Sequence, residues 1–320
     1  MARIIFLLLV FVSFNNVSAQ EIKVNGIINF TGKIGKYPVE LQLIIPQDRD
    51  SIFGEYSYLN HTDQDAIMLI GKLSDDWIML EERTYNTKLK KYEVTGYLKL
   101  QPPVNQFSLG RWSKSAKYLN ANEKSLLIDL LLKENLKEVN PYHFDYSITK
   151  KKANYENISE VASSYYSITS LTIDYGQNKV QKITGFKEYD LVDKVPEIIL
   201  EDMNFDGYLD LKLMLNYPDK SKGDYSYIYY IYDLRQVKFI RNFILDNIGV
   251  AFFDASSQTV FKYDADGSGN EGTNTYKWQK DKLYLMKEER VYEGDIFVHY
   301  KEYKIVNGKL VEVKSYKKKE

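Results

Sequence analysis

Alternating apolar and polar residues, the pattern of a half-buried β-strand, dominate the chain from about residue 22 to residue 112. The clearest run is 39–45, where apolar and polar side chains alternate until Pro46 stops the strand. Turn-forming residues such as Ser74-Asp75-Asp76 separate the runs that follow. Those further candidate strands are 52–59, 66–73, 77–84, 92–100 and 107–112. Neighbouring strands joined by short loops pair antiparallel, so we expect a meander that forms an open sheet or a partly closed barrel.

One segment has the period of a helix instead. Four leucines between positions 126 and 131 recur at helical spacing, and Asn120 followed by Glu123 resembles a capping box. These patterns predict one helix near 120–137, which Asn140-Pro141 ends. The expected organisation is a signal peptide at 1–19, an N-terminal β-meander domain at 20–118, a connecting helix at 119–139 and a C-terminal β-domain at 140–320.

The remainder of the chain returns to short strands punctuated by Asp, Asn and Gly. The strand at 225–232 carries tyrosines on both faces, which favours a core strand buried on two sides; a tyrosine-lined binding face is the alternative. Asn307-Gly308 separates two strand-like runs and predicts a hairpin turn. Since no exact repeat is visible, a propeller would have to be irregular. The sequence therefore predicts an all-β fold apart from one helix.

The first nineteen residues have the order of a secretory signal peptide. Arg3 gives a short positive region, 4–12 is apolar, and Val17-Ser18-Ala19 fits a small-residue cleavage site. The apolar run is too short to span a bilayer comfortably, although a retained N-terminal anchor is the alternative. No other segment is apolar enough to span. We therefore expect an exported protein, periplasmic or extracellular, with no membrane span in the mature chain.

Composition excludes several kinds of chemistry. The chain has no cysteine, which rules out disulfides, thiolate nucleophiles, thiolate zinc sites and lipoprotein processing. Its formal net charge of −1 argues against a nucleic acid partner. His61, His143 and His299 are scattered, and the adjacent Glu81 and Glu82 should point to opposite faces of a strand. We therefore expect no catalytic site and no enzymatic activity.

The segment 202–210 has the spacing of a calcium-binding loop. Oxygen-bearing side chains occupy loop positions 1, 3, 5 and 9, and Gly207 at position 6 permits the sharp turn. Ca²⁺ takes six to eight oxygen ligands, which alternate residues of a curling backbone can supply. The candidate ligands are Asp202, Asn204, Asp206, Tyr208 (through its backbone carbonyl) and Asp210.

The surroundings of this loop distinguish it from an EF-hand. An EF-hand loop joins two helices and ends with a bidentate glutamate at position 12, whereas strand-like runs flank this loop and Leu213 occupies that position. We expect a strand–loop–strand site holding one structural Ca²⁺; a β-turn without metal is the alternative. A second acidic segment, 264–271, lacks the spacing because Gly267 directly follows its second acid. It is expected to be a glycine-rich loop between two strands.

From about residue 194 to residue 282 the chain resembles a family of exported bacterial β-proteins with one internal calcium loop. Its best-known members are periplasmic immunity proteins that inhibit peptidoglycan-cleaving, lysozyme-like toxins. The matching features are the segment 201–211, the tyrosine-rich strand ending at Tyr232-Asp233, and the glycine-rich loop followed by 275–278. The resemblance implies an irregular propeller-like C-terminal β-domain, and it implies calcium ligation by the five residues named above.

Three functions remain open at this point. The first is an exported, non-catalytic envelope immunity or inhibitor protein that places a C-terminal loop in the cleft of a peptidoglycan hydrolase. The second is glycan or surface binding through tyrosine-bearing sheet faces. The third, an enzyme acting on polysaccharide, requires two convergent carboxylates, and the sequence selects no such pair.

Overall fold

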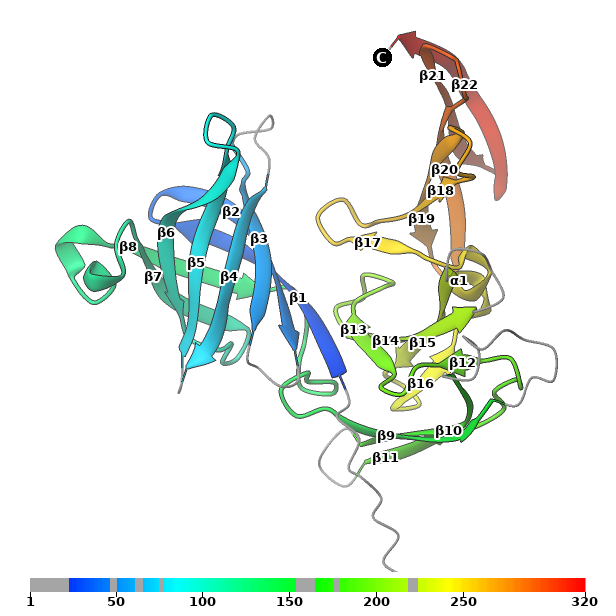
Figure 1. The fold of residues 1–320 in the computed structure, drawn as a ribbon, viewed down its shortest axis with the longest axis horizontal. Coiled ribbons are helices and arrows are strands. Elements are labelled where there is room, and N and C mark those ends of the chain that lie inside the picture. The colour runs from blue at the N-terminus through cyan, green and yellow to red at the C-terminus, as the bar shows by residue number, and fades with distance from the viewer. Residues whose placement is uncertain are drawn as a thin grey trace, which may run out of the picture.

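The computed structural model describes residues 23–46, 51–60, 66–74, 77–153, 165–174, 179–217 and 224–319. The fold is all-β, as predicted, and its strands form three sheets of twelve, four and six strands (Figure 1). The expected signal peptide and His61 lie outside the described residues. None of the helices in the described ranges is long and apolar enough to cross a membrane.

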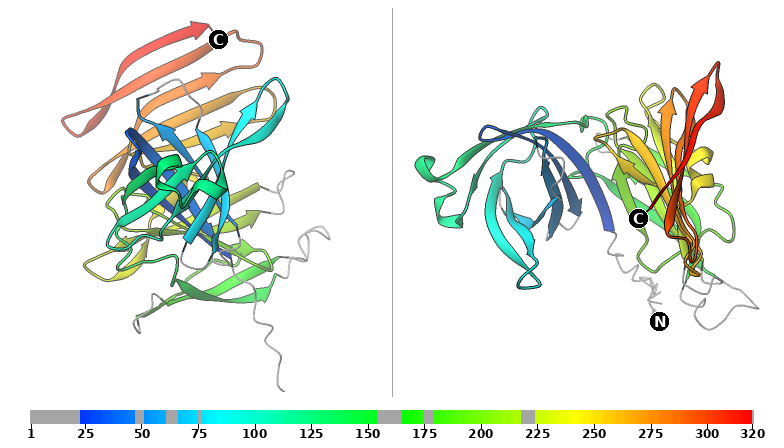
Figure 2. Two further views of the ribbon diagram at one scale, coloured as in Figure 1. Left: turned by 90° about the vertical axis from the view of Figure 1, so that its left-hand side faces the viewer. Right: turned by 90° about the horizontal axis from the view of Figure 1, so that it is seen from above.

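The first eight strands close into an antiparallel barrel (Figures 1 and 2). They are β1 (Lys23–Ile34), β2 (Tyr37–Pro46), β3 (Ile52–Tyr58), β4 (Ile67–Ser74), β5 (Trp77–Asn86), β6 (Lys91–Leu100), β7 (Phe107–Ser113) and β8 (Leu126–Leu132). Each strand pairs with the next, and β8 returns to pair with β1 from Phe30 to Ile34. The predicted antiparallel meander is confirmed, and closure removes its edges.

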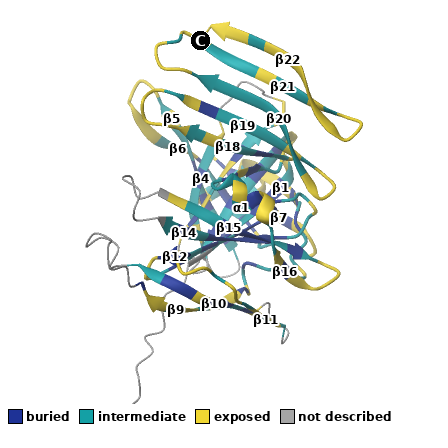
Figure 3. Ribbon diagram, turned by 90° about the vertical axis from the view of Figure 1, so that its right-hand side faces the viewer, coloured by how far each residue is buried: buried dark blue, intermediate teal, exposed yellow. Residues whose placement is uncertain are grey.

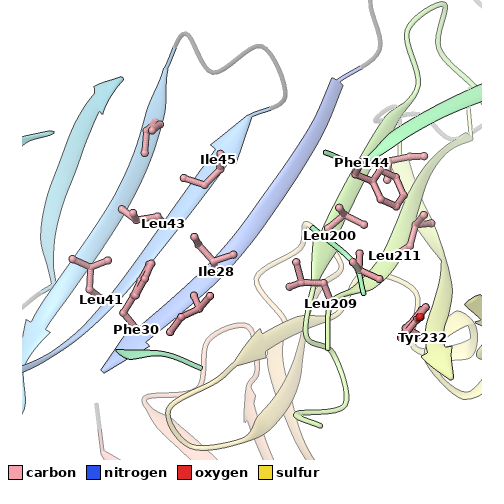
Figure 4. Close-up of a cluster of buried hydrophobic side chains, with 14 of the residues drawn as sticks. Ile28, Phe30, Leu41, Leu43, Ile45, Phe144, Leu200, Leu209, Leu211 and Tyr232 are labelled. Carbon is pink, nitrogen blue, oxygen red and sulfur yellow. The ribbon is translucent and has the colours of Figure 1, made fainter. Parts of the chain in front are cut away.

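Alternation along the strands fills the barrel with side chains. On β2, Val39, Leu41, Leu43 and Ile45 are buried and alternate with half-buried residues. These side chains belong to the main hydrophobic core of the molecule (Figure 4). An eight-stranded barrel has an interior just wide enough for such side chains to fill it.

The prediction of a helix near 120–137 was wrong. Two short 3₁₀ turns, η1 (Ala116–Tyr118) and η2 (Asn122–Lys124), precede β8, which pairs with both β7 and β1. The buried members of β8 are Ile128, Leu130 and Leu132, and its exposed members include Leu127 and Leu131. Because leucine occupies both faces, the spacing fits a helix and a strand equally well. Ladder hydrogen bonds on both sides of β8 then outweigh the helix propensity of leucine.

The next four strands form a separate sheet, and the following four extend the sheet of the barrel. The separate sheet contains β9 (Asp145–Lys152), β10 (Tyr166–Asp174), β11 (Val180–Ile183) and β12 (Leu191–Val192). The extension contains β13 (Glu197–Glu201), β14 (Asp210–Tyr217), β15 (Asp224–Asp233) and β16 (Lys238–Arg241). After α1 (Phe243–Ile248), the third sheet runs through β17 (Phe252–Asp254), β18 (Thr259–Ala265), β19 (Glu271–Gln279), β20 (Lys282–Val291), β21 (Phe297–Val306) and β22 (Lys309–Lys319).

Strand β1 belongs to both halves of the molecule. Its first four residues pair in parallel with β13, whereas its last five pair antiparallel with β8. Along its other side, β2 pairs with it from Asn25 to Ile34. The barrel and β13–β16 are therefore one continuous sheet of twelve strands.

The middle of β15 is buried on both faces. Tyr230 and Tyr232 of β15 lie in the main core, which also contains Tyr146 of β9 and buried residues of β10. Figure 4 shows Tyr232 and Phe144 in this core. Tyr229 faces the other way, into a smaller core with Leu245 of α1 and residues of β17 and β18. The prediction that 225–232 is a core strand buried on two sides is confirmed from Ile228 to Tyr232, whereas Tyr225 is exposed.

The last three strands project from the body as an open ribbon (Figures 1 and 2). All residues in 273–319 are described, and none of them is buried (Figure 3). Asn307 and Gly308 have φ of 50° and 75° and join β21 to β22, as the hairpin prediction required.

Gly32 provides a test of barrel closure. A Cβ on this residue would lie 2.1 Å from the carbonyl oxygen of Asp129 and 2.8 Å from Cα of Leu130, so the β1–β8 seam accepts no side chain there. We expect Gly32→Ala to lower the free energy of unfolding by about 1 to 3 kcal/mol, the usual range for overpacking, in urea denaturation. Thr31→Ala, on the same strand and the opposite face, should change it much less. Equal stability of the two variants would contradict the close approach at the seam.

Candidate functional site

The acidic segment 202–209 joins β13 to β14, so the strand–loop–strand placement of the predicted calcium loop is confirmed. Pairing of Glu201 with Asp210 fixes the two ends of the loop. Phe205 (φ 60°) and Gly207 (φ 87°) take left-handed backbone conformations, which curl the chain back on itself. The predicted ligands therefore lie on one compact turn.

Asp202 anchors this turn through both oxygens of its carboxylate. The backbone N–H groups of Asp206 and Gly207 donate to Asp202 Oδ1 and Oδ2 at 3.1 and 2.9 Å. The exposed Asp206 carboxylate accepts from the N–H of Tyr208 at 3.0 Å and from Asn204 Nδ2 at 2.8 Å. Each carboxylate oxygen has two acceptor positions, so these bonds leave acceptor capacity unused.

Asp210 is the most deeply buried carboxylate of the loop. Its side chain is fully buried, and Oδ2 and Oδ1 accept from the N–H groups of Met203 and Tyr232, both at 2.8 Å. Burial raises the pKa of Asp210 well above its ordinary value, and the nearby Asp202 and Asp206 carboxylates add to this rise, although the two N–H donors oppose it. Asp210 thereby ties the loop to the central strand β15.

Further negative charge lies beside the loop. Burial raises the pKa of Asp202 to about 7, and the Asp206 and Glu134 carboxylates contribute to the rise against the opposing N–H donors. Glu134 is itself buried and accepts from the backbone N–H and Nδ2 of Asn29 at 2.9 and 2.8 Å. Burial raises its pKa as well. The buried carboxyl groups of Asp202, Asp210 and Glu134 thus lie near the exposed carboxylate of Asp206, and a cation bound among them would offset their repulsion.

The loop is also bonded to three separate parts of the molecule. The N–H of Asn135, just after the barrel, donates to the carbonyl oxygen of Gly207 at 2.6 Å. Trp278 Nε1 on β19 donates to the carbonyl oxygen of Met203 at 2.9 Å. Together with the Asp210 contact to β15, these bonds join the barrel exit, the central sheet and the C-terminal sheet at one turn.

The donors of the loop suit a hard cation in type and in spacing. Asp202, Asn204, Asp206, the carbonyl of Tyr208 and Asp210 are the residues that would hold Ca²⁺. Within the described ranges, no three His, Cys, Asp or Glu side chains converge as they would around an ion. The carboxylates of Asp202, Asp206 and Asp210 instead accept hydrogen bonds from backbone N–H groups. The hydrogen bond from Asn204 to Asp206 lies on the exposed side of the loop.

The second acidic segment, 264–271, contains the loop 266–270 that joins β18 to β19, and it includes the ends of both strands, so the predicted loop between two strands is confirmed. Asp266 accepts from Asn270 Nδ2 at 2.6 Å and from the N–H and hydroxyl of Ser268, both at 2.8 Å. These hydrogen bonds, led by that of Asn270, hold the pKa of Asp266 well below its usual range. Asn270 Oδ1 also accepts from the N–H of Glu293 at 3.0 Å. The acidic tip is therefore held in one conformation by its own side chains.

A cleft of about 610 Å³ lies between the outer face of the barrel and the second half of the molecule. Along β1, β2 and β3, polar side chains on the outer face of the barrel alternate with apolar side chains that point into it. The cleft is lined by residues that include Asn29, Glu40, Gln42, Glu55, Lys133, Glu201, Lys212, Tyr227, Phe252, Phe253 and Phe261. Polar and aromatic groups that converge on one concave surface are typical of binding sites.

A buried ion pair lies within this cleft. Lys212 Nζ is 2.7 Å from Glu201 Oε2, and the two side chains are only 8% and 7% exposed. The same ammonium group lies 5.4 and 5.3 Å from the ring centroids of Tyr227 and Phe253. Cation–π attraction from these rings adds to the ion pair and helps to offset the cost of desolvating the lysine.

A second, more exposed pair spans the cleft. Lys133 Nζ lies 2.9 Å from Glu40 Oε1 on β2. It also donates to the carbonyl oxygen of Ala255, between β17 and β18, at 3.4 Å. This lysine therefore bridges the barrel and the C-terminal sheet at the cleft.

Lys212 and Glu201 were not among the functional residues predicted from the sequence. Lys212 alternates with Leu211 and Leu213, which suggests an outward-facing residue. Its face is buried because residues of β17, remote in sequence, cover it. The sequence signal for a buried charge at this position was a single lysine in the middle of an otherwise apolar strand.

The acids and histidines considered for catalysis do not converge. Glu82 points into the barrel and accepts from Tyr56, Trp112 and Thr95 at 2.6–2.7 Å, whereas Glu81 faces outward and pairs with Arg83, so the predicted opposite orientation is confirmed. Among the described histidines, His143 is exposed, and His299 bonds Asp295 at 2.7 Å near the start of β21.

Comparisons with known proteins show distant likeness alone. No protein-family model matches the chain, and a search of curated proteins finds no match. Among solved structures, the chain is similar to a type IV secretion system related protein from Xanthomonas, with 16% sequence identity and a TM-score of 0.39. The match covers 67% of this chain and 91% of that chain. At this similarity the match bears on neither family nor function.

The buried ion pair predicts that substitutions of Lys212 and Glu201 have non-additive effects on the free energy of unfolding. Lys212→Met leaves the Glu201 carboxylate buried without its partner, and we expect a loss of about 3 to 5 kcal/mol in the free energy of unfolding. Adding Glu201→Gln should restore more than half of this loss, because the second substitution removes the unpaired charge. Urea denaturation of the two single variants and the double variant measures the coupling. Strictly additive losses would show that the two side chains do not stabilise each other.

Proposed function

We propose that the chain is an exported, non-catalytic binding protein whose segment 202–210 holds one structural Ca²⁺. The observation that carries this proposal is that three parts of the molecule are bonded to a turn crowded with buried carboxyl groups. A divalent cation would offset the repulsion among Asp202, Asp206 and Asp210. The signal-like segment at 1–19 supports export to the periplasm or the cell exterior. Extracellular calcium sites function with dissociation constants as weak as about 10⁻⁴–10⁻³ M.

In this proposal the role of calcium is architectural. An ion that binds only the folded state stabilises it by about 2.7 kcal/mol when its concentration is 100 times the dissociation constant. Because the loop contacts the barrel exit, β15 and β19, this stabilisation would extend to the junction of all three. The absence of glutamate at position 12 and the strand flanks argue against a calcium sensor.

Asp206→Ala tests the calcium proposal. The side chain is exposed and bonds only within the loop, so its removal should leave the core intact. For wild type we expect Ca²⁺ to raise the melting temperature by several degrees and chelator to lower it. In the variant the melting temperature should be lower and insensitive to calcium.

Asp266→Ala is the matched control, because Asp266 also closes an exposed loop through its carboxylate but lacks the calcium spacing. This variant should keep the full calcium response. If chelator leaves the wild-type melting temperature unchanged, the segment 202–210 is only a turn.

For the partner we propose a lysozyme-like peptidoglycan hydrolase, which the resemblance of residues 194–282 implies. The acidic tip 264–271 supports this choice, since it projects from a hairpin and is fixed by the Asp266 hydrogen bonds. A preorganised loop loses little conformational entropy when it enters a cleft. Glu271 and the nearby Glu293 make this tip complementary to a basic surface, and Asp264, which pairs with Lys262 at 2.9 Å, adds a third carboxylate that a basic partner could engage.

Inhibition of peptidoglycan hydrolysis tests the partner directly. The chain should retain a hydrolase from envelope extracts and inhibit its cleavage of peptidoglycan at equimolar concentration. Asp264→Ala combined with Glu271→Ala should weaken inhibition at least tenfold while Asp266 still holds the loop together. Asp233→Ala, which removes a half-buried acid at the end of β15, is the control and should inhibit as wild type does. Undiminished hydrolysis in the presence of the chain would exclude this partner.

Glycan binding is the second candidate, and the cleft is the observation that favours it. Exposed Phe252 and half-buried Tyr227 and Phe261 lie near the polar side chains of Gln42 and Glu55. Aromatic surfaces combined with hydrogen-bonding groups suit sugar rings. On a glycan array, Phe252→Ala should then abolish binding, whereas Tyr225→Ala, outside the cleft lining, should not. A wild-type chain that binds no glycan removes this candidate.

A further inference from the structure

The hairpin formed by β21 and β22 ends in a cluster of exposed aliphatic side chains. Val306, Leu310 and Val311, next to the Asn307-Gly308 turn, are 49%, 41% and 42% exposed. Figures 2 and 3 show this end of the hairpin at the periphery of the molecule, away from the barrel. Nothing in the described part of the chain covers these side chains, and neither core cluster includes them.

The aliphatic side chains occupy both faces of the hairpin end. Ile305 lies directly opposite Leu310, and Val306 lies opposite Lys309. Because successive side chains of a strand point to opposite faces, Ile305 and Leu310 share one face, whereas Val306 and Val311 share the other. A protein partner laid against one face of the hairpin would leave the other face in water. An apolar medium that surrounds the tip would cover both.

Lysines accompany this apolar end. β21 and β22 together carry seven lysines and two glutamates, although the whole chain has a net charge of −1. Lys304 and Lys309 lie within the tip itself, and Lys314 follows on β22. A lysine side chain can keep its ammonium group at a polar surface while its methylene stem lies along apolar neighbours.

We propose that the tip of the β21–β22 hairpin binds an anionic lipid bilayer. Ile305, Val306, Leu310 and Val311 enter the interface between headgroups and acyl chains, and Lys304 and Lys309 bind the lipid phosphates. Apolar burial combined with attraction between basic side chains and anionic lipids is the recognised basis of such peripheral binding. β21 and β22 bond each other along the hairpin, but no described strand pairs with the outer edge of β22, so the tip can enter only the hydrated headgroup region and not the hydrocarbon core.

Two other occupants of this end fit the observations less well. A second copy of the chain would bring seven lysines against seven lysines if the two hairpins met symmetrically. A single protein face would leave aliphatic side chains exposed on the other side of the hairpin. The lipid surface satisfies the apolar residues on both faces and the charge of the lysines together.

Co-sedimentation of the full chain with large unilamellar vesicles tests the proposal. The vesicles contain phosphatidylcholine alone or with about a third of phosphatidylglycerol. We expect binding to the anionic vesicles that weakens as salt is raised, and at least tenfold weaker binding to the neutral vesicles. Val306→Ser with Leu310→Ser should lower the partition constant for anionic vesicles at least tenfold, and Lys304→Gln with Lys309→Gln should lower it severalfold.

Val180→Ser is the matched control, since Val180 is an aliphatic residue of β11 that is 62% exposed. It should bind vesicles as wild type does. Circular dichroism and the calcium response of all variants show whether the fold is retained. No binding of wild type to anionic vesicles, or equal binding by the serine double variant, would overturn the proposal. So would a dimer in light scattering that this double variant converts to a monomer, because a second copy would then cover the hairpin.

Discussion

The second half of the molecule depends on a carboxylate that has no contact with water. A fully buried Asp210 is tolerated only if its oxygens are bonded, and they accept N–H groups from Met203 in the loop and Tyr232 in β15. These two bonds fix the loop against the central sheet. The carbonyl oxygens of Met203 and Gly207 are then available to Trp278 and Asn135. The position of one carboxylate thereby determines where the C-terminal sheet and the barrel exit attach.

Strand β1 supplies the second connection between the halves. It closes the barrel with β8 and continues into the central sheet through its parallel pairing with β13. The outer face of the barrel is thus held at the side of β13–β15, and the cleft with the Lys212–Glu201 pair lies between them. Two β-structures that share a strand have little freedom to separate, so this cleft is expected to keep its shape when it binds. A preformed site of this kind suits recognition, in which affinity is lost whenever the site must first be ordered.

Local patterns in the sequence predicted the features that local chemistry determines. Alternation on β2, the Asn307-Gly308 turn and the strand flanks of the acidic loop follow from side-chain period and backbone conformation within a few residues. The leucine-rich segment failed because its pattern is compatible with two structures, and pairing with the distant β1 decides between them. Burial of Lys212 could not be anticipated either, since Phe253 and Tyr227 lie 41 and 15 positions further along the chain. The acidic loop itself was recognisable from spacing, but its contacts with Asn135 and Trp278 join segments far apart in sequence.

Terbium luminescence measures most directly whether the loop holds a cation. Tb³⁺ replaces Ca²⁺ at oxygen sites, and tyrosine excitation of Tyr208, within the loop, would sensitise its emission. We predict sensitised emission that saturates at one Tb³⁺ per chain, is displaced by Ca²⁺, and is lost when Asp202 is replaced by asparagine. Absence of saturable emission, or emission that persists without the Asp202 carboxylate, would contradict a calcium site at the junction.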